Sequence, residues 1–257
     1  MIIGHRGVAA LAPENTLSGI RKAAECGLNW VEIDTQLSAD GVPVIFHDDT
    51  VDRCTDGEGK LGAFNVSALK NLDAGSWFDK AHTNESVPTL EETLSFCVDE
   101  GMSINLEIKV YRDAQVAPLV DAVSAVLASS AFPAEKLLIS SFSKDALLRC
   151  KAAIPQCRFG FIADKRNISD LHAFDDVGLY SVHVDHRMLT PELAKEIKGK
   201  GYILNIWTLN ESEKADAFIA MGVDNIITDD PTLFIPKQPE DARCQRPSVR
   251  SVQGKFL

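Results

Sequence analysis

The chain has 257 residues, of which 45% are hydrophobic and 25% charged, and its formal net charge is −11. These values suit a globular protein with a full hydrophobic core, built as one large domain or two small ones. The acidic balance argues against nucleic acid or an anionic membrane surface as the main partner, because such binders usually carry a basic face. A small anionic substrate stays open, since a bound metal or one arginine can dominate the local field.

The absence of a signal-peptide pattern and of a long apolar run predicts a cytoplasmic protein without membrane insertion. The chain enters a strand at Ile2 with no signal-peptide pattern before it, and no apolar run approaches the roughly 20 residues of a membrane helix. The cysteines, at positions 26, 54, 97, 150, 157 and 244, form no C-x-x-C pair. In a chain of this length we expect them to be free thiols in a reducing compartment.

Strand-like runs alternate with helical stretches almost to the end of the chain. The expected strands are Ile2–His5, Trp30–Gln36, Ser103–Lys109, Leu137–Ser141, Arg158–Ala163, Ser181–Asp185, Tyr202–Trp207 and Asn225–Thr228. The expected helices lie near 16–26, 89–100, 114–128, 143–153, 167–176, 191–199 and 211–221. This alternation predicts an α/β fold, a parallel (β/α)₈ TIM barrel. A doubly wound open sheet is the alternative, although its glycine-rich dinucleotide turn is missing from the sequence.

One segment interrupts the alternation. The turn Ser38–Gly41 joins the second strand to Val42–His47 too tightly for a parallel crossover, so it predicts an antiparallel hairpin that folds back over the barrel mouth. Residues 48 to about 87 would then form a small insertion at the C-terminal face, where such barrels carry their sites. Residues 1–235 are expected to be a single catalytic domain, and residues 236–257 a surface or disordered tail.

Two carboxylates are predicted to point into the barrel from the second strand. Glu32 and Asp34 are two residues apart, which places both on one face of a strand, with Val31 and Ile33 on the other. The apolar pair belongs against the surrounding helices, so the acids face the interior. Two buried acids without partners would be very costly, so we expect something to neutralise them.

The next barrel strand repeats the pattern, with Asn105, Glu107 and Lys109 on one face. Adjacent strands would therefore bring three carboxylates together, from Glu32, Asp34 and Glu107. Without a cysteine or histidine cluster, such a set indicates a hard divalent cation with oxygen ligands, Mg²⁺ or Ca²⁺. The alternative is a structural ion-pair network that includes Lys109.

Two histidines are expected above these carboxylates. His5 ends the first strand, and His47 ends the returning hairpin. Either one alone would be interpreted as an ordinary turn histidine. Two imidazoles that flank a metal suit a reaction with one general base and one general acid, so His5 and His47 are the candidate catalytic residues.

Cations beside the histidines indicate an anionic substrate. Arg6 offers a planar fork for a carboxylate or phosphate, and Lys109 adds a second positive charge. Arg6 could also pair with Glu14 across the turn, and both roles hold if Glu14 orients Arg6. The sequence has neither the G-x-S-x-G nucleophile elbow nor the G-x-x-x-x-G-K-[ST] phosphate loop, so phosphoester cleavage fits better than acyl transfer.

Two further segments are expected at the same rim. Trp207 ends a predicted strand, where it would either line the pocket beside the alcohol part of a substrate or pack the top of the barrel. The segment Thr228-Asp229-Asp230-Pro231 closes the last strand, and its acidic residues are predicted to cap the following helix.

The motifs, taken in chain order, resemble a known family. They are His5-Arg6-Gly7, Pro13-Glu14-Asn15-Thr16, Glu32-Ile33-Asp34, His47-Asp48, Glu107-Ile108-Lys109, Ser140-Ser141-Phe142, Trp207-Thr208 and Thr228-Asp229. Their order is similar to that in the glycerophosphodiester phosphodiesterases, above all the bacterial cytosolic enzymes, and the likeness covers roughly residues 1–235. The family often has Arg-Thr-Thr after the His-Asp motif, where this chain has Arg53-Cys54-Thr55.

The resemblance implies a (β/α)₈ barrel that uses a divalent cation to hydrolyse glycerophosphodiesters, such as glycerophosphocholine or glycerophosphoethanolamine, to sn-glycerol 3-phosphate and an alcohol. It implies metal ligation by Glu32, Asp34 and Glu107, acid–base catalysis by His5 and His47, and phosphate binding by Arg6 and Lys109. Similarity to bacterial phosphoinositide phospholipases implies that His5 is the base and His47 the acid.

Several alternatives stay open at this point. The attacking group could be water or the glycerol 2-hydroxyl. A phospholipase of the same barrel type could act on intact lipids, or an inactive barrel could only bind phosphodiesters. The oligomeric state and the preferred head group do not follow from the sequence.

Overall fold

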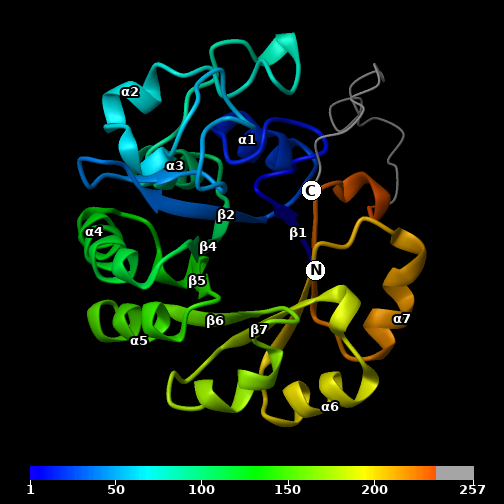
Figure 1. The fold of residues 1–257 in the computed structure, drawn as a ribbon. Coiled ribbons are helices and arrows are strands. Elements are labelled where there is room, and N and C mark those ends of the chain that lie inside the picture. The colour runs from blue at the N-terminus through cyan, green and yellow to red at the C-terminus, as the bar shows by residue number, and fades with distance from the viewer. Residues whose placement is uncertain (236–257) are drawn as a thin grey trace.

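A closed barrel of parallel strands forms the centre of the computed structural model, which describes residues 1–235 (Figure 1). The barrel strands are β1 (Ile2–His5), β2 (Trp30–Leu37), β4 (Ser103–Ile108), β5 (Leu137–Ser141), β6 (Arg158–Ala163), β7 (Ser181–Asp185), β8 (Ile203–Trp207) and β9 (Asn225–Thr228). Each pairs in parallel with its neighbours, and β1 pairs with both β2 and β9. The predicted TIM barrel is therefore confirmed, and this closure excludes the open doubly wound sheet. The predicted tail, residues 236–257, lies outside the described residues.

Helices cover the outside of the barrel (Figure 1). They are α1 (Leu17–Glu25), α3 (Leu90–Asp99), α4 (Val116–Ser129), α5 (Lys144–Ala153), α6 (Pro191–Gly199) and α7 (Ala215–Ala220). The helical stretch expected near 167–176 is present as the 3₁₀ helix Ile168–Phe174. Leu171 and Phe174 are both buried and three residues apart, a spacing that matches the three residues per turn of a 3₁₀ helix.

The predicted hairpin is present. Strand β3 (Pro43–Ile45) runs antiparallel to β2, with Thr35 opposite Ile45. The side chain of Gln36 donates hydrogen bonds to the carbonyl oxygens of Phe46, His47 and Asp48 at 2.8, 2.9 and 2.9 Å. One amide therefore holds the end of the hairpin, including His47, against β2.

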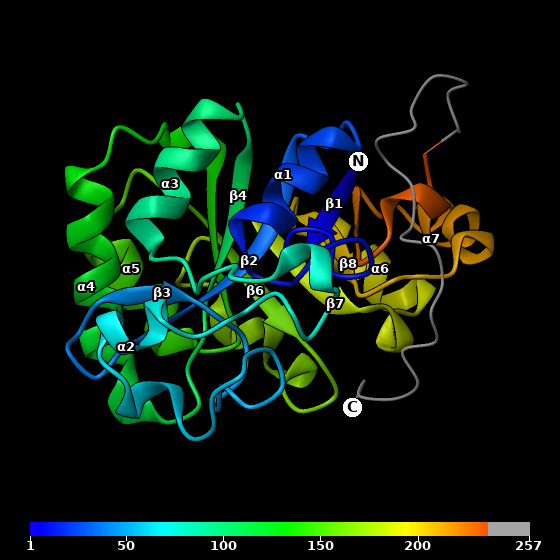
Figure 2. The same cartoon turned by 90° about the horizontal axis from the view of Figure 1, so that it is seen from above.

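The insertion after the hairpin has a small core of its own. It carries the short helix α2 (Val66–Lys70) and lies to one side of the barrel strands, next to β3 (Figure 2). Its buried apolar side chains are Val44, Phe46, Val51, Cys54, Leu61, Leu69, Ala74 and Val87. Because this cluster packs separately from the main core, the insertion can hold its loops over the barrel mouth as a unit.

Apolar and polar side chains alternate along β2 and β4, and this alternation points the polar ones into the barrel. Val31 and Ile33 are fully buried in the main core, as are Leu106 and Ile108 on β4. The residues between them are polar and line a cavity inside the barrel; they are Glu32, Asp34, Asn105 and Glu107. In the strand register, Glu32 lies opposite Asn105 and Asp34 opposite Glu107. The predicted inward direction of the acids is confirmed.

The cysteines differ in state. Four of them, Cys54, Cys97, Cys150 and Cys157, are free and buried. The prediction of free thiols is wrong for Cys26, which is disulfide-bonded, and Cys244 lies outside the described residues. Within residues 1–235, no helix has both the length and the apolar character needed to span a membrane.

Candidate active site

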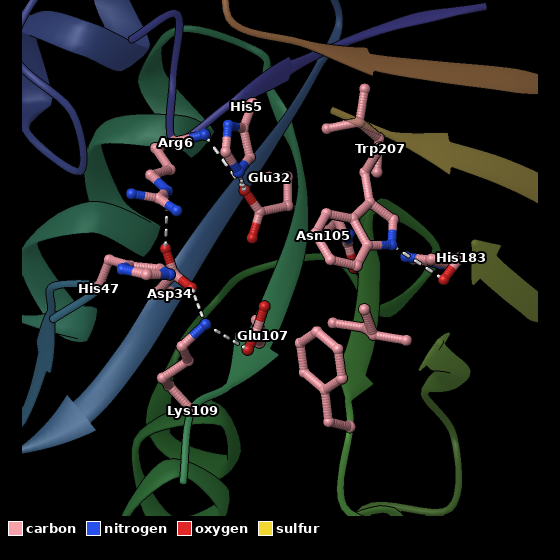
Figure 3. A pocket seen from close by; sticks show the side chains of 13 residues that line it. His5, Arg6, Glu32, Asp34, His47, Asn105, Glu107, Lys109, His183 and Trp207 are labelled. Carbon is pink, nitrogen blue, oxygen red and sulfur yellow. Dashed lines mark hydrogen bonds and ion pairs between the residues drawn. The ribbon is translucent and has the colours of Figure 1, made fainter. Parts of the chain in front are cut away.

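Three carboxylates converge at the C-terminal ends of the barrel strands (Figure 3). Glu32 and Asp34 project from β2 and Glu107 from β4, and one oxygen of each lies within 4.8 Å of the other two. All three side chains are buried. The Nζ of Lys109 lies 3.0 Å from Glu107 Oε1 and 3.5 Å from Asp34 Oδ1, so its ammonium offsets part of the negative charge.

Crowding of the buried carboxylates favours the protonated form of Glu32. Burial and repulsion from Asp34 raise the pKa of Glu32 to about 8. Burial also disfavours the ionised form of Asp34, but the adjacent His47 and Lys109 outweigh it and lower the pKa of that carboxyl. Buried oxygen donors at this spacing can hold a hard divalent cation, which would favour the ionised form of all three carboxylates.

Asn15 fixes the position of Asp34. Its Nδ2 donates to Asp34 Oδ2 at 2.9 Å, and its Oδ1 accepts from the Asp34 backbone N–H at 3.1 Å. Asn15 has a positive φ of 55°, a conformation that asparagine adopts more readily than most residues. The next residue, Thr16, caps α1 by accepting a hydrogen bond from the Gly19 N–H, which confirms the predicted helix start.

His5 is paired with a carboxylate from the far end of the chain. Its Nδ1 lies 2.6 Å from Oδ1 of Asp229, the residue after β9, and its Nε2 lies 3.9 Å from Glu32 Oε2. Asn210 donates to the other oxygen of Asp229 at 2.6 Å. The predicted capping role therefore belongs to Asp230, which accepts from the Thr232 N–H, and not to Asp229.

His47 has a carboxylate partner of its own. Its Nδ1 lies 2.7 Å from Oδ1 of the adjacent Asp48. Arg53, from the insertion, donates to Asp48 Oδ2 at 2.7 Å and to Glu14 through both Nη atoms at 2.7 Å. A continuous chain of charged hydrogen bonds thus ties His47 to the loop that carries Arg6.

Arg6 occupies a strained turn that directs it into the site. Its φ is 52°, in the left-handed region, and Gly7 follows with φ 88°. Such a conformation is uncommon for a residue with a side chain and is frequent at functional sites. Arg6 Nη1 donates to Glu14 Oε1 at 2.7 Å, and Nε lies 3.7 Å from Asp34 Oδ2. The predicted pairing with Glu14 is present, and it aims the guanidinium at the acid cluster (Figure 3).

Two connected cavities open over these groups. The inner one, about 60 Å³, is lined by both histidines, the carboxylates and Arg6 on one side and by Trp207, Phe142 and His183 on the other. The outer one, about 500 Å³, shares His47, Glu107, Lys109, Phe142 and Trp207 with it. Trp207 is fixed by a hydrogen bond from its Nε1 to the carbonyl oxygen of His183 at 3.0 Å. Of the two interpretations, the tryptophan therefore lines the pocket.

Asn105 is an additional polar group in the inner cavity. It is fully buried, and neither its Oδ1 nor its Nδ2 has a hydrogen-bond partner among residues 1–235. A buried amide without partners is costly, so such a group is available to a bound molecule.

The sequence analysis missed the partners that orient the site. Asp229 directly follows a barrel strand, which is where TIM barrels place functional residues, and this position could have indicated it. Asn15 belongs to the motif Pro13-Glu14-Asn15-Thr16, which by itself does not indicate a contact with Asp34. Arg53 lies in an insertion without periodicity, where a sequence offers no structural argument for its contacts.

Comparisons with known proteins agree with the fold and with the motifs. The chain is 34% identical to a glycerophosphodiester phosphodiesterase of Caldanaerobacter subterraneus subsp. tengcongensis, over 91% of this chain and 96% of the relative. A phosphodiesterase of Oleispira antarctica, solved in complex with the product sn-glycerol-3-phosphate, has a TM-score of 0.83 and 34% identity, covering 89% of this chain and 92% of that one. A glycerophosphodiester phosphodiesterase of Thermotoga maritima has a TM-score of 0.71 and 31% identity, covering 91% and 96%.

Fold and likeness together define the class as a phosphodiesterase built on a TIM barrel. The sequence model of the glycerophosphoryl diester phosphodiesterase family matches residues 5–233. The chain belongs to this family, and the resemblance inferred from the motifs is confirmed.

Proposed function

We propose that the protein hydrolyses glycerophosphodiesters to sn-glycerol 3-phosphate and an alcohol, with Mg²⁺ or Ca²⁺ bound by Glu32, Asp34 and Glu107. The observation that carries this proposal is the meeting of that acid cluster with two carboxylate-backed imidazoles, of His5 and His47, around one cavity. The product in the Oleispira relative supports the substrate class.

Each histidine is suited to one proton transfer. Asp229 accepts the Nδ1 proton of His5, which leaves Nε2 as the basic atom on the side of the acid cluster. His5 would remove a proton from the attacking oxygen, of water or of the glycerol 2-hydroxyl. His47, with Nδ1 bonded to Asp48, would protonate the leaving alkoxide through Nε2.

The phosphate would be held by Arg6 and Lys109. Glu14 orients Arg6, and Lys109 reaches across the acid cluster toward the same cavity. When bound, a divalent cation neutralises charge that develops on the phosphate oxygens. Trp207 would contact the carbon atoms of the substrate on the opposite wall.

Release of sn-glycerol 3-phosphate from glycerophosphocholine and glycerophosphoethanolamine tests this function. We expect release with Mg²⁺ or Ca²⁺, loss with EDTA and recovery on adding the metal back. His5→Gln and His47→Gln should each lower kcat by about 10²–10⁴. His172→Gln is the matched control, because His172 lies outside both cavities and its side chain is 69% exposed. Metal-replete protein that released product from no glycerophosphodiester would refute the proposal.

The same preparation separates the two attacking groups. Attack by the 2-hydroxyl passes through a cyclic glycerophosphate, which can be trapped and identified by mass spectrometry, whereas direct attack by water forms none.

We further propose that residues 1–235 act as the single catalytic domain, in the cytoplasm. The family match covers residues 5–233, which supports the single domain. Four free buried thiols favour a reducing compartment, whereas the disulfide at Cys26 counts against it. Activity of a chain that ends at residue 235, and fractionation of cells, test the two statements.

A further inference from the structure

The outer cavity is where the variable part of a substrate would lie. Its volume, about 500 Å³, is several times that of the inner cavity, and the two share His47 and Lys109. Under the proposed function, on which this inference rests, the phosphate lies at Lys109 and His47 protonates the leaving alcohol. The alcohol must therefore extend from His47 into the outer cavity.

Positive charge dominates the wall of this outer cavity. Lys109 and Arg166 both line it, and the only acidic residue among its lining residues is Glu107, which belongs to the acid cluster. Arg166 is held through Nε and Nη2 by Asp164, at 2.7 and 2.5 Å. Asp164 itself does not line the cavity, so Arg166 presents its guanidinium to the ligand without an intervening carboxylate.

Of the three aromatic rings that line the outer cavity, from Tyr111, Phe142 and Trp207, the Phe142 ring already carries protein cations. A quaternary ammonium is usually bound over the face of an aromatic ring at about 6 Å or less from its centroid. The ring of Phe142 has Lys109 Nζ at 5.7 Å and Arg166 Cζ at 5.4 Å, and Trp207 packs against it edge-on at 5.8 Å. Two protein cations thus occupy the Phe142 ring, and a choline group elsewhere in the cavity would lie close to their positive charge.

Three polar side chains of the outer cavity that could have bound a cation instead form hydrogen bonds within the protein. The Ser141 hydroxyl donates to the Ile108 carbonyl, and the Asn167 carboxamide oxygen accepts from the Asp164 N–H. Tyr111 OH donates to the His47 carbonyl oxygen. Arg166 and Lys109 are also paired with carboxylates, but each has more N–H donors than these pairs use, and the remaining donors suit a molecule rich in hydrogen-bond acceptors.

We propose that the outer cavity selects glycerophosphodiesters whose leaving alcohol is an uncharged or anionic polyol over those whose leaving alcohol carries a quaternary ammonium. Arg166 is the specificity-determining residue of this selection, and Phe142 is the surface that holds its guanidinium in the cavity.

Separate assays of two substrates that release the same product test this selection. The metal-loaded full chain is assayed with glycerophosphoinositol and with glycerophosphocholine, and sn-glycerol 3-phosphate is measured in both reactions. We expect kcat/KM for the inositol ester to exceed that for the choline ester by about tenfold, equivalent to about 1.4 kcal/mol. Arg166→Glu should lower this ratio by at least about tenfold, and Arg166→Gln by less, because glutamine adds no opposite charge.

Arg187→Glu is the matched control for charge and exposure. Arg187 pairs with Asp185 at 2.6 Å, and its side chain is 75% exposed compared with 72% for Arg166, but it lines neither cavity. Its substitution should leave the substrate ratio unchanged. Thermal unfolding of each variant confirms that the compared proteins are folded.

The possible outcomes separate this inference from the proposed function. The selection is overturned if both esters give product and the wild-type ratio of kcat/KM, inositol ester over choline ester, is at or below one. It is also overturned if Arg166→Glu and Arg166→Gln leave that ratio unchanged. Either result leaves the proposed hydrolase function intact. Product from neither ester overturns the proposed function instead.

Discussion

Replacing Asp229 with asparagine should disable His5 without changing the shape of the site. Asn210 fixes this side chain, because its Oδ1 accepts from the Asp229 backbone N–H at 3.0 Å and its Nδ2 donates to Asp229 Oδ2 at 2.6 Å. An asparagine at this position would turn its oxygen to the Asn210 amide and its NH₂ group to His5 Nδ1. His5 would then carry its proton on Nε2 and could not accept another one there.

The size of the effect follows from this change of tautomer. In the serine-protease triad, the same substitution behind a catalytic histidine lowers kcat by about 10⁴. We expect kcat of the Asp229→Asn variant to fall by about 10²–10⁴, with KM nearly unchanged. The side chains of His5 and Asp229 are only 16% and 24% exposed. Loss of their charged hydrogen bond should therefore also lower the free energy of unfolding, by about 1.5–3 kcal/mol.

The loss of stability should depend on pH. Burial disfavours the charged form of His5, but the carboxylates of Asp229 and Glu32 outweigh this effect, so the pKa of His5 is raised. The pair consequently stabilises the folded protein below the pKa of histidine in the unfolded chain. That stabilisation is lost as the pH rises through the higher pKa of the folded state. The difference in unfolding free energy between wild type and Asp229→Asn should shrink over this range.

Steady-state release of sn-glycerol 3-phosphate and urea denaturation at several pH values measure both effects. Asp230→Asn is the control, because it removes the same charge one residue along, where the side chain caps the turn Pro231–Leu233. Adding Asn210→Ala to Asp229→Asn frees the new amide to rotate, so part of the lost activity should return. An Asp229→Asn variant whose kcat stays within about twofold of wild type would refute the reasoning.

Three further predictions concern the acid cluster and its support. Glu107→Gln should weaken binding of Mg²⁺ or Ca²⁺ by at least about tenfold in calorimetry, and an unchanged Kd would remove Glu107 from the ligand set. Because the pKa of Glu32 is raised to about 8, metal binding at neutral pH should release close to one proton and tighten as the pH rises towards 8. Calorimetry in buffers of different ionisation enthalpy measures that proton, and its absence would contradict the assignment. Arg53→Ala leaves Glu14 and Asp48 without their shared partner and should lower the free energy of unfolding by about 2–4 kcal/mol. Arg21→Ala is the control: it removes an exposed ion pair with Glu100 and should lower the free energy of unfolding by less than about 0.5 kcal/mol.

Much of the fold and of the acid cluster could be predicted from sequence because both depend on local periodicity. The two-residue repeat of a strand fixes which way Glu32, Asp34 and Glu107 point once Val31 and Ile33 are assigned to the helix side. The short Ser38–Gly41 turn likewise allows only a hairpin. These features need no knowledge of distant residues.

The partners of the histidines could not be predicted in the same way. Asp229 lies 224 residues after His5, and only closure of the barrel brings the two side chains together. Arg53 reaches Glu14 from a loop whose path is set by the small core of the insertion. The helical stretch expected near 167–176 is present, but its 3₁₀ type could not be predicted from periodicity.

The seam where β1 meets β9 has a consequence for how the protein is made. His5 belongs to the first strand of the barrel, and the carboxylate that orients it follows the last barrel strand, with Ile2 opposite Ile226 where the two strands pair. A nascent chain that has not yet delivered its ninth strand therefore holds a histidine without its partner. We therefore expect chains that end before Asp229 to be inactive as phosphodiesterases, because they lack the carboxylate that pairs with His5.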